Sequence, residues 1–327
     1  MNRKVIISTI LILTTLLTFG QFSEKKIETD SSHIRIIKNS VYKTYTETYK
    51  FKDLEWYSVH FIKDTTRLNT EGWSIKDGKR IGIWKEYNFE GQLMYTRDYD
   101  NAVCEVNKSL YPFHNTLERM KTKADNLIIN TYSKEFFEKH VRFDFNCYAY
   151  DEDGYVGSWT EPIERKPTKF LFRYQVKLNT SEWYDEMIGI ELNENGEYVP
   201  NEGFWNNYGF EKVNSNSKTF KIDKNKAIEI AKSKGLQTND LSKVAEFLKW
   251  EKFKKPEFYN GQFKYYITEF TDEIKDIKTE GRSRITYKYN VYSFDPWTGE
   301  FIEKKRMKRV REWEKNSGFT SDLKPDE

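Results

Sequence analysis

The sequence has few of the residues that carry catalytic or metal chemistry. Among 327 residues there are 2 cysteines and 4 histidines, and the histidines lie far apart, at His33, His60, His114 and His140. None of the patterns Gly-x-Ser-x-Gly, His-Glu-x-x-His or Cys-x-x-Cys occurs. Such patterns place a nucleophile near its oxyanion site, or two ligands on one side of a metal ion. We therefore expect no catalytic residue, no metal site and no cofactor.

Acidic residues are plentiful but follow no ligand or catalytic spacing. Residues 151–154, Asp-Glu-Asp-Gly, cluster carboxylates, but the apolar and small residues 155–157 follow where a calcium loop would continue its alternating ligands. A solvated turn is the simpler interpretation. With 51 acidic residues, pairs such as Glu182 with Asp185 arise by chance. A hydrolase whose carboxylates meet only in the fold stays as the enzymatic alternative.

Neither sign of charge dominates, and long apolar runs are missing after the first twenty residues. Val5 to Phe19 is apolar and follows Arg3 and Lys4, which is the pattern of a secretory signal peptide over residues 1–20. The run is shorter than the roughly 20 apolar residues of a membrane anchor. Removing Arg3 and Lys4 from the 54 basic residues leaves 52 against 51 acidic ones, a net charge of +1. We therefore expect an exported protein, periplasmic or extracellular, with no transmembrane segment after cleavage and no nucleic-acid partner.

The two cysteines leave two alternatives open. Cys104 and Cys147 are 43 positions apart and carry no metal-binding or redox spacing. Export would put them where a disulfide persists, and the closed loop would then contribute about 4 kcal/mol on the chain-entropy estimate. Free buried cysteines are also common.

Aromatic residues are abundant and indicate a folded, strand-rich chain. Phe, Tyr and Trp make up 17% of a sequence whose hydrophobic content is only 37%, and each large ring buries much apolar area. Residues 21–40 are polar and predict a loose leader. Residues 41–112 alternate aromatic and polar positions, and Asp77-Gly78 and Gly91 mark tight reversals. These features predict a small antiparallel meander over residues 41–112.

Part of this meander follows a repeat-like pattern. Residues 78–93 fit Gly-x-x-x-Gly-x-Trp-x-x-Tyr-x-x-x-Gly-x-Leu, with Trp84 and Tyr87 at the aromatic positions. The pattern resembles the variant MORN repeat, over about residues 72–101. The resemblance implies a structural spacer or interaction surface and no reaction. The alternative is a meander in which Trp84 and Tyr87 only pack on their neighbours.

Two stretches change from strand to helix periodicity. The first starts near Asn115 and carries an apolar stripe that includes Leu117, Met120, Ala124 and Ile128. The second follows the N-cap candidate Asp223 and presents Ala227, Ile228 and Ala231 before a stop at Gly235. Each stripe should cover an antiparallel sheet. We predict one such unit over residues 113–215 and a second over 216–312, related by duplication or unrelated, with a polar tail over 313–327.

The second unit carries a family resemblance. Residues 224–236 (Lys-Asn-Lys-Ala-Ile-Glu-Ile-Ala-Lys-Ser-Lys-Gly-Leu) and residues 289–302, with the turn Asp-Pro-Trp-Thr-Gly-Glu, resemble a PepSY domain over about residues 221–305. Residues 115–200 would be a degenerate second copy. The resemblance implies a cystatin-like shape, export, and inhibition or binding of peptidases. The predicted fold class is therefore α+β, with tandem helix-on-antiparallel-sheet units behind the small meander.

The function that these patterns favour is binding without catalysis. We expect an exported protein of the cell envelope that contacts a protein partner or modulates a peptidase. The alternative is glycan or peptidoglycan binding through exposed aromatic rings, and the candidate contact residues are Trp84, Tyr87, Tyr289 and Trp297. A basic run from Lys304 to Arg311 is either a contact for an anionic lipid or acidic partner, or a solvated strand end.

Overall fold

The structure is a computed structural model that describes residues 22–179, 182–199, 207–209, 219–252, 261–278, 282–314 and 317–326. The predicted signal peptide, residues 1–20, lies outside this part of the chain. The chain divides into two compact units. The first runs up to His114 and includes residues 159–164, and the second comprises residues 115–158 and the chain from Arg165 onward. None of the helices in the described ranges is both long and apolar enough to cross a membrane.

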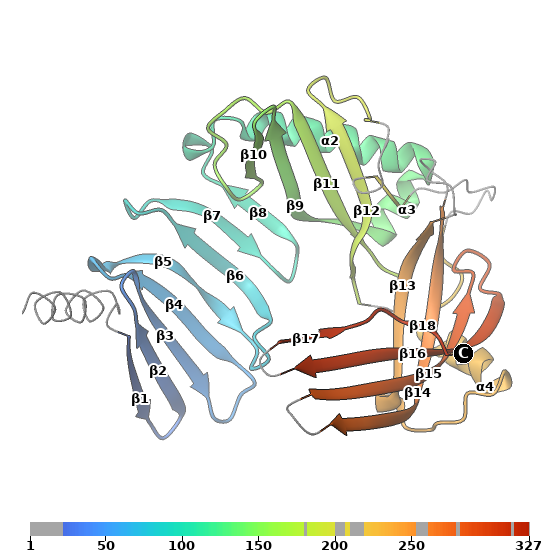
Figure 1. The fold of residues 1–327 in the computed structure, drawn as a ribbon. Coiled ribbons are helices and arrows are strands. Elements are labelled where there is room, and N and C mark those ends of the chain that lie inside the picture. Colours follow the sequence, from blue (N-terminus) through green and yellow to red (C-terminus); the bar gives the residue numbers. More distant parts are fainter. Residues whose placement is uncertain are drawn as a thin grey trace, which may run out of the picture. The chain divides into compact units, whose positions relative to one another are not determined.

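The first unit is built on one eight-stranded antiparallel sheet, in which each strand pairs with the next along the chain (Figure 1). A 3₁₀ turn, η1 (Lys108–Leu110), follows the last strand. The strands are β1 (Ser23–Glu28), β2 (Ser32–Lys38), β3 (Tyr42–Tyr49), β4 (Glu55–Phe61), β5 (Asp64–Ser74), β6 (Arg80–Tyr87), β7 (Leu93–Asp98) and β8 (Val103–Val106).

Trp84 on β6 is a central packing residue of this sheet. Its side chain is buried, and its indole N–H donates a hydrogen bond of 2.7 Å to the carbonyl oxygen of Trp73. The ring lies over Gly72, where an added Cβ would come within 2.3 Å of the indole. A glycine is therefore required at position 72 because the large ring fills the space that a side chain would take.

In its described residues, the second unit contains two antiparallel sheets and three helices. The second sheet has the strand order β10-β9-β11-β12 and is covered by α2 and α3. Ser133 lies between the two helices and is the N-cap of α3. Its hydroxyl accepts a hydrogen bond from the Phe136 backbone N–H, so a new helix begins at this point. The elements are α2 (His114–Thr131), α3 (Lys134–His140), β9 (Val141–Asp151), β10 (Gly154–Ser158), β11 (Lys169–Val176) and β12 (Tyr184–Asn193).

The third sheet has the strand order β13-β14-β15-β16-β17, and β18 also pairs with β16. Helix α4 covers one face of it, and its N-cap is Asp223, as predicted. The 3₁₀ turn η2 (Leu241–Lys243) precedes β13. The elements are α4 (Lys224–Ser233), β13 (Val244–Lys252), β14 (Gly261–Lys278), β15 (Arg282–Phe294), β16 (Phe301–Glu314), β17 (Ser317–Thr320) and β18 (Lys324–Pro325).

The predicted α+β fold class is wrong. Helices do form at the two stretches with an amphipathic pattern. The stripe residues Ala124, Ile128, Ala227 and Ala231 are buried. Large antiparallel sheets nevertheless dominate, and the helices are a minor part of the chain. The segments assigned to a polar leader and a polar tail are largely strands: β1 and β2 at one end, and the end of β16 with β17 and β18 at the other.

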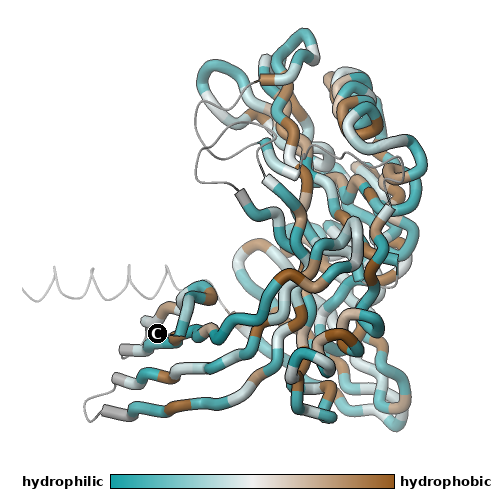
Figure 2. Tube along the Cα trace, turned by 90° about the vertical axis from the view of Figure 1, so that its right-hand side faces the viewer, coloured by the Kyte–Doolittle hydropathy of each residue, from teal (hydrophilic) through white to brown (hydrophobic). Residues whose placement is uncertain are grey.

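The reason for this error is that strands exposed on both faces carry no period-two signal. All six residues of β1 are exposed, and so are all residues of β17 and β18. Figure 2 shows hydrophilic and hydrophobic residues interleaved along the strands, without long apolar blocks. Hydrogen bonding to a neighbouring strand, and not an apolar face, places these segments in a sheet.

Candidate functional site

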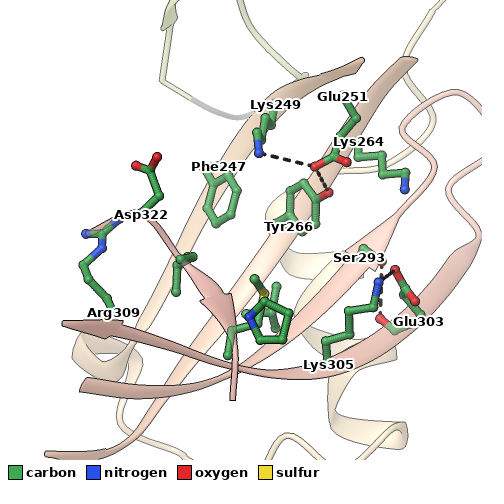
Figure 3. A pocket seen from close by; sticks show the side chains of 14 residues that line it. Phe247, Lys249, Glu251, Lys264, Tyr266, Ser293, Glu303, Lys305, Arg309 and Asp322 are labelled. Atoms are coloured by element: carbon green, nitrogen blue, oxygen red, sulfur yellow. Dashed lines mark hydrogen bonds and ion pairs between the residues drawn. The ribbon is translucent and has the colours of Figure 1, made fainter. Parts of the chain in front are cut away.

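One face of the third sheet is hollowed into a groove of about 510 Å³ (Figure 3). The strand register explains why its residues share a face. Phe247 on β13 lies opposite Tyr266 on β14, Tyr266 lies opposite Ser293 on β15, and Ser293 lies opposite Glu303 on β16. Because direct partners in an antiparallel sheet point to the same side, these four strands present one continuous surface. We call this surface the main groove.

The opposite face of the same sheet belongs to the core. It carries large buried side chains that lie under α4, namely Leu248, Phe263, Tyr265, Ile267, Tyr292 and Phe294. The Ala227 and Ala231 side chains of α4 are also buried. The sheet therefore has one closed face and one face that no described helix covers.

The floor of the main groove is apolar although it faces outward. The rings of Phe247 and Tyr266 stack with centroids 4.7 Å apart and an interplanar angle of 18°. Val291 is buried beneath the surface, and Met307 is half-buried beside it. Leu323 and Pro325 complete the apolar lining from the C-terminal segment. An exposed sheet face is ordinarily polar, so this floor is unusual.

The Tyr266 hydroxyl forms a hydrogen bond at the edge of the floor. Its hydroxyl donates to the Glu251 carboxylate at 2.6 Å. Burial, followed by this hydrogen bond, raises the pKa of Tyr266 far above its ordinary value. The phenol therefore stays protonated and contributes a neutral ring to the groove.

The C-terminal segment forms one wall of the main groove. Strands β17 and β18 both pair with β16, and Ser321 spans the interval between them. The Ser321 N–H donates to the Val310 carbonyl at 2.8 Å, and its hydroxyl accepts from the Val310 N–H at 2.9 Å. The strand pairing is interrupted between β17 and β18, and the residues of this interruption, Asp322 and Leu323, line the groove.

An ion-pair cluster holds the end of that wall. The Asp326 carboxylate lies 3.3 Å from the Lys308 ammonium and 3.6 Å from the Lys288 ammonium. Desolvation acts to raise the pKa of Asp326, but the hydrogen bonds and charges of Lys308 and Lys288 outweigh it and hold the pKa below its ordinary value. The carboxylate is therefore charged at neutral pH and binds β18 to the sheet.

The polar rim of the main groove has more cations than anions. Its cationic residues are Lys249, Lys264, Lys305 and Arg309, and its acidic residues are Glu251, Glu303 and Asp322. Lys305 pairs with Glu303 at 2.7 Å, and Lys249 approaches Glu251 at 3.6 Å. Within the described residues, Lys264 and Arg309 form no ion pair within 4.0 Å. Figure 3 shows Arg309 at the same end of the groove as Asp322.

A side groove of about 290 Å³ continues the same face along β15, β16 and β17. It shares Arg309 with the main groove and adds Arg311, Tyr287, Tyr289, Trp313 and Phe319. The Arg311 guanidinium lies 4.3 Å from the centroid of the exposed Trp313 ring. The two grooves together form an aromatic and aliphatic surface that two arginines border.

The four predicted contact residues lie in different surroundings. Tyr289 lines the side groove, and burial raises its pKa. Trp297 is half-buried and packs against Phe220 and Tyr132, with centroids 4.7 and 5.7 Å away. Trp84 is buried, so its ring is not offered to a partner.

Tyr87 is half-buried on β6, and its hydroxyl donates to Glu71 at 3.1 Å. It belongs to the first unit together with Trp84, whereas Tyr289 and Trp297 belong to the second. Of the four residues, the structure places only Tyr289 on the grooved face. The residues that sequence reasoning missed are Phe247, Tyr266, Val291, Met307 and Leu323, because strand alternation alone does not show which face stays uncovered.

Both cysteines are free thiols in the structure, but Cys104 belongs to the first unit and Cys147 to the second, so their pairing stays a prediction. Cys147 is buried in β9, where desolvation raises the pKa of its thiol. Burial also raises the pKa of Cys104 to about 12. Neither thiol has the thiolate character that a nucleophile requires. Among the described residues, no group of three His, Cys, Asp or Glu side chains is arranged to hold a metal ion.

The fold and the grooves define an antiparallel β-sheet protein with one open, partly apolar sheet face. No family model and no curated protein matches the chain. Among solved structures, the crystal structure of a lipopolysaccharide binding protein aligns over 98% of this chain and 79% of its own, with 8% identity and a TM-score of 0.16. That TM-score is too low to indicate a shared fold. The resemblances to PepSY and MORN sequences stay predictions.

Proposed function

We propose that this chain is a non-catalytic binding protein whose ligand lies in the main groove. The observation that carries the proposal is the combination of an apolar floor and a charged rim on a sheet face that no described helix covers. A solvent-facing sheet normally presents polar side chains. A concave, largely apolar surface with a few polar groups is typical of a ligand site.

Binding is favoured over catalysis because both glutamates of the groove are held by neighbouring side chains. Glu251 accepts from Tyr266 and lies near Lys249, and Glu303 pairs with Lys305. A catalytic acid and base need environments that separate their pKa values and leave both free for a substrate. The proposal includes export, which rests on the sequence of residues 1–20. Peptidase modulation stays a prediction, and glycan binding is a prediction that the screen below also tests.

The test is a ligand screen read by thermal unfolding. A ligand at one hundred times its Kd stabilises the folded state by about 2.7 kcal/mol, which is readily measured. The panel contains amphiphiles, soluble glycans, peptidoglycan fragments and acidic peptides. We expect one class to raise the Tm of the wild-type protein, and the variant Met307→Glu to lose this shift because a charge then lies on the apolar floor.

The matched control is Ile274→Glu. Ile274 is an exposed aliphatic residue of β14 that lines neither groove, so the variant adds the same charge elsewhere on the sheet. Ile274→Glu should keep the full ligand-induced shift. A ligand that stabilises Met307→Glu as strongly as the wild type would show that the groove is not the site.

A further inference from the structure

We infer that the ligand of the main groove is a single-chain anionic amphiphile, bound one molecule at a time. This inference rests on the proposed function and adds the chemistry of the ligand. Its apolar chain would lie along the floor from Met307 to the Phe247–Tyr266 pair. Its anionic head group would lie at Arg309 and Arg311.

The floor has the form that a linear apolar chain requires. Along β16, the positions that face the groove run from Glu303 through Lys305 and Met307 to Arg309. Apart from Met307 these positions are charged, so the apolar part of the floor runs diagonally across the strands and not along β16. From Met307 this diagonal passes Val291, which pairs with Lys305, and reaches Tyr266 and the stacked Phe247 ring at the register of Glu303. Four residues along the strand at roughly 3.3 Å each and two strands at roughly 4.8 Å each make the distance from Met307 to Tyr266 about 16 Å. The apolar surface is thus elongated and ends at charged residues.

The charge at one end selects an anion. Arg309 and Arg311 project from the same face of β16, two residues apart, and both border the side groove. Asp322 lines the main groove at the end where Arg309 lies, whereas the lining of the side groove, which includes both arginines, contains no acidic residue. The guanidinium group binds carboxylate and phosphate through paired N–H donors. Lys249 and Lys305 are already engaged with Glu251 and Glu303.

Two other ligand classes fit this surface less well. An extended peptide gains much of its affinity from main-chain hydrogen bonds at a sheet edge, whereas the middle of the groove lies on β14 and β15, which are paired with a strand on each side. A sugar needs several free hydrogen-bonding groups. The lining contains no Asn or Gln, and its Ser293 and Tyr266 hydroxyls donate within the protein.

The experiment measures binding of decanoate, dodecanoate and tetradecanoate monomers to the full chain by calorimetry. Dodecyl maltoside and dodecyltrimethylammonium are the neutral and cationic comparisons. We expect one site per chain, and an affinity that rises about fourfold per methylene group while the chain lies on the floor. Dodecanoate should bind at least about tenfold more tightly than either comparison, since a desolvated ion pair forms only with the anion.

The variant Arg309→Glu should weaken dodecanoate binding by about tenfold or more. Its control is Arg306→Glu, because Arg306 lies on the same strand and is exposed, but points to the other side of the sheet. The control should bind within about twofold of the wild type. Both substituted side chains are exposed, and equal Tm values would show that folding is unchanged.

The outcomes separate this inference from the proposed function. The inference of an anionic ligand would be overturned if the neutral amphiphile bound as tightly as dodecanoate, or if Arg309→Glu left the affinity for dodecanoate unchanged. The groove would still be the binding site if Met307→Glu abolished binding. If the protein bound phosphatidylglycerol vesicles but not monomeric dodecanoate, the ligand would be a bilayer surface and not a single molecule. This result would overturn the inference. Binding that Met307→Glu does not affect would remove the proposed function as well.

Discussion

At the residue scale, Glu269 shows how a charged group stabilises the closed face of the third sheet. The side chain is 4% exposed, and its carboxylate accepts hydrogen bonds of 2.9 Å from the backbone N–H groups of Gln237 and Thr238 and from the Asn290 amide. Desolvation acts to raise the pKa of Glu269, but the hydrogen bonds outweigh it and lower the pKa. The carboxylate fixes the segment that follows α4 to β14 and β15.

We predict that Glu269→Gln lowers the free energy of unfolding by about 1–3 kcal/mol at neutral pH, because the amide replaces one acceptor oxygen by a donor that faces backbone N–H groups. Since the folded pKa lies below the ordinary value of 4.5, the ionised group stabilises the protein above that pH. The contribution is lost as the pH falls through the folded pKa. Urea titrations between pH 7 and pH 3 would measure this. An equal pH dependence in the variant would contradict the prediction.

Residue-level sequence patterns predicted local features well. Asp77-Gly78 forms the expected reversal, in which Gly78 has a φ of 86°. Asp295 and Gly299 form the second one, where the Asp295 carboxylate accepts from the Trp297 N–H at 2.7 Å and Gly299 has a φ of 77°. Such turns depend on a few neighbouring residues, so the sequence contains all the information that they need. The Trp297 ring was not predictable in this way, because its partners lie elsewhere in the chain.

At the element scale, the C-terminal strands show how a polar segment becomes part of a sheet. Residues 317–326 contain few apolar side chains, and their order comes from pairing with β16 and from the ion pairs of Asp326. The pairing has a second consequence, since it places Leu323 and Pro325 against the main groove. Strand β18 is thus both a sheet edge and a wall of the candidate site.

We predict that Asp326→Asn loosens β18 without unfolding the unit, because it removes the charge that holds Lys308 and Lys288. Exchange of the backbone amide hydrogens of Lys324 and Asp326 should become severalfold faster at neutral pH. The wild type should approach the variant as the pH falls through the lowered pKa of Asp326, where the carboxylate loses its charge. High salt should act in the same direction.

The control for this prediction is Asp322→Asn. Asp322 is exposed and lies in the same segment, but no ion pair within 4.0 Å binds it to the sheet within the described residues. Its variant should leave the exchange of β18 unchanged. Equal acceleration in both variants would show that net charge, and not the Asp326 cluster, orders this strand.

At the scale of the whole molecule, an aromatic cluster joins the parts of the second unit. Trp297 comes from the turn between β15 and β16, Phe136 comes from α3, and Tyr132 follows α2. Trp297 lies 5.4 Å from Phe136 and 4.7 Å from Phe220, measured between ring centroids. The turn beside the third sheet thereby packs on the helices that cover the second sheet.

We predict that Trp297→Ala lowers the free energy of unfolding of the second unit by about 2–4 kcal/mol, from lost burial and a partly unfilled space. Denaturant unfolding followed by near-ultraviolet circular dichroism would measure it. Trp297→Phe keeps a ring in the cluster and should lose less than half as much. A surface role would instead give a change within about 0.5 kcal/mol for both variants.

The sequence by itself determined the tight turns, the two amphipathic helices and the alternating strands, because each depends on residues that are near one another in the chain. It did not determine that the polar ends join the sheets, since those strands are ordered by backbone pairing and not by an apolar face. Only the tertiary structure decided which face of the third sheet α4 covers and which stays open. The candidate site exists because that choice leaves Phe247, Tyr266, Val291 and Met307, from four separate strands, together on the uncovered side.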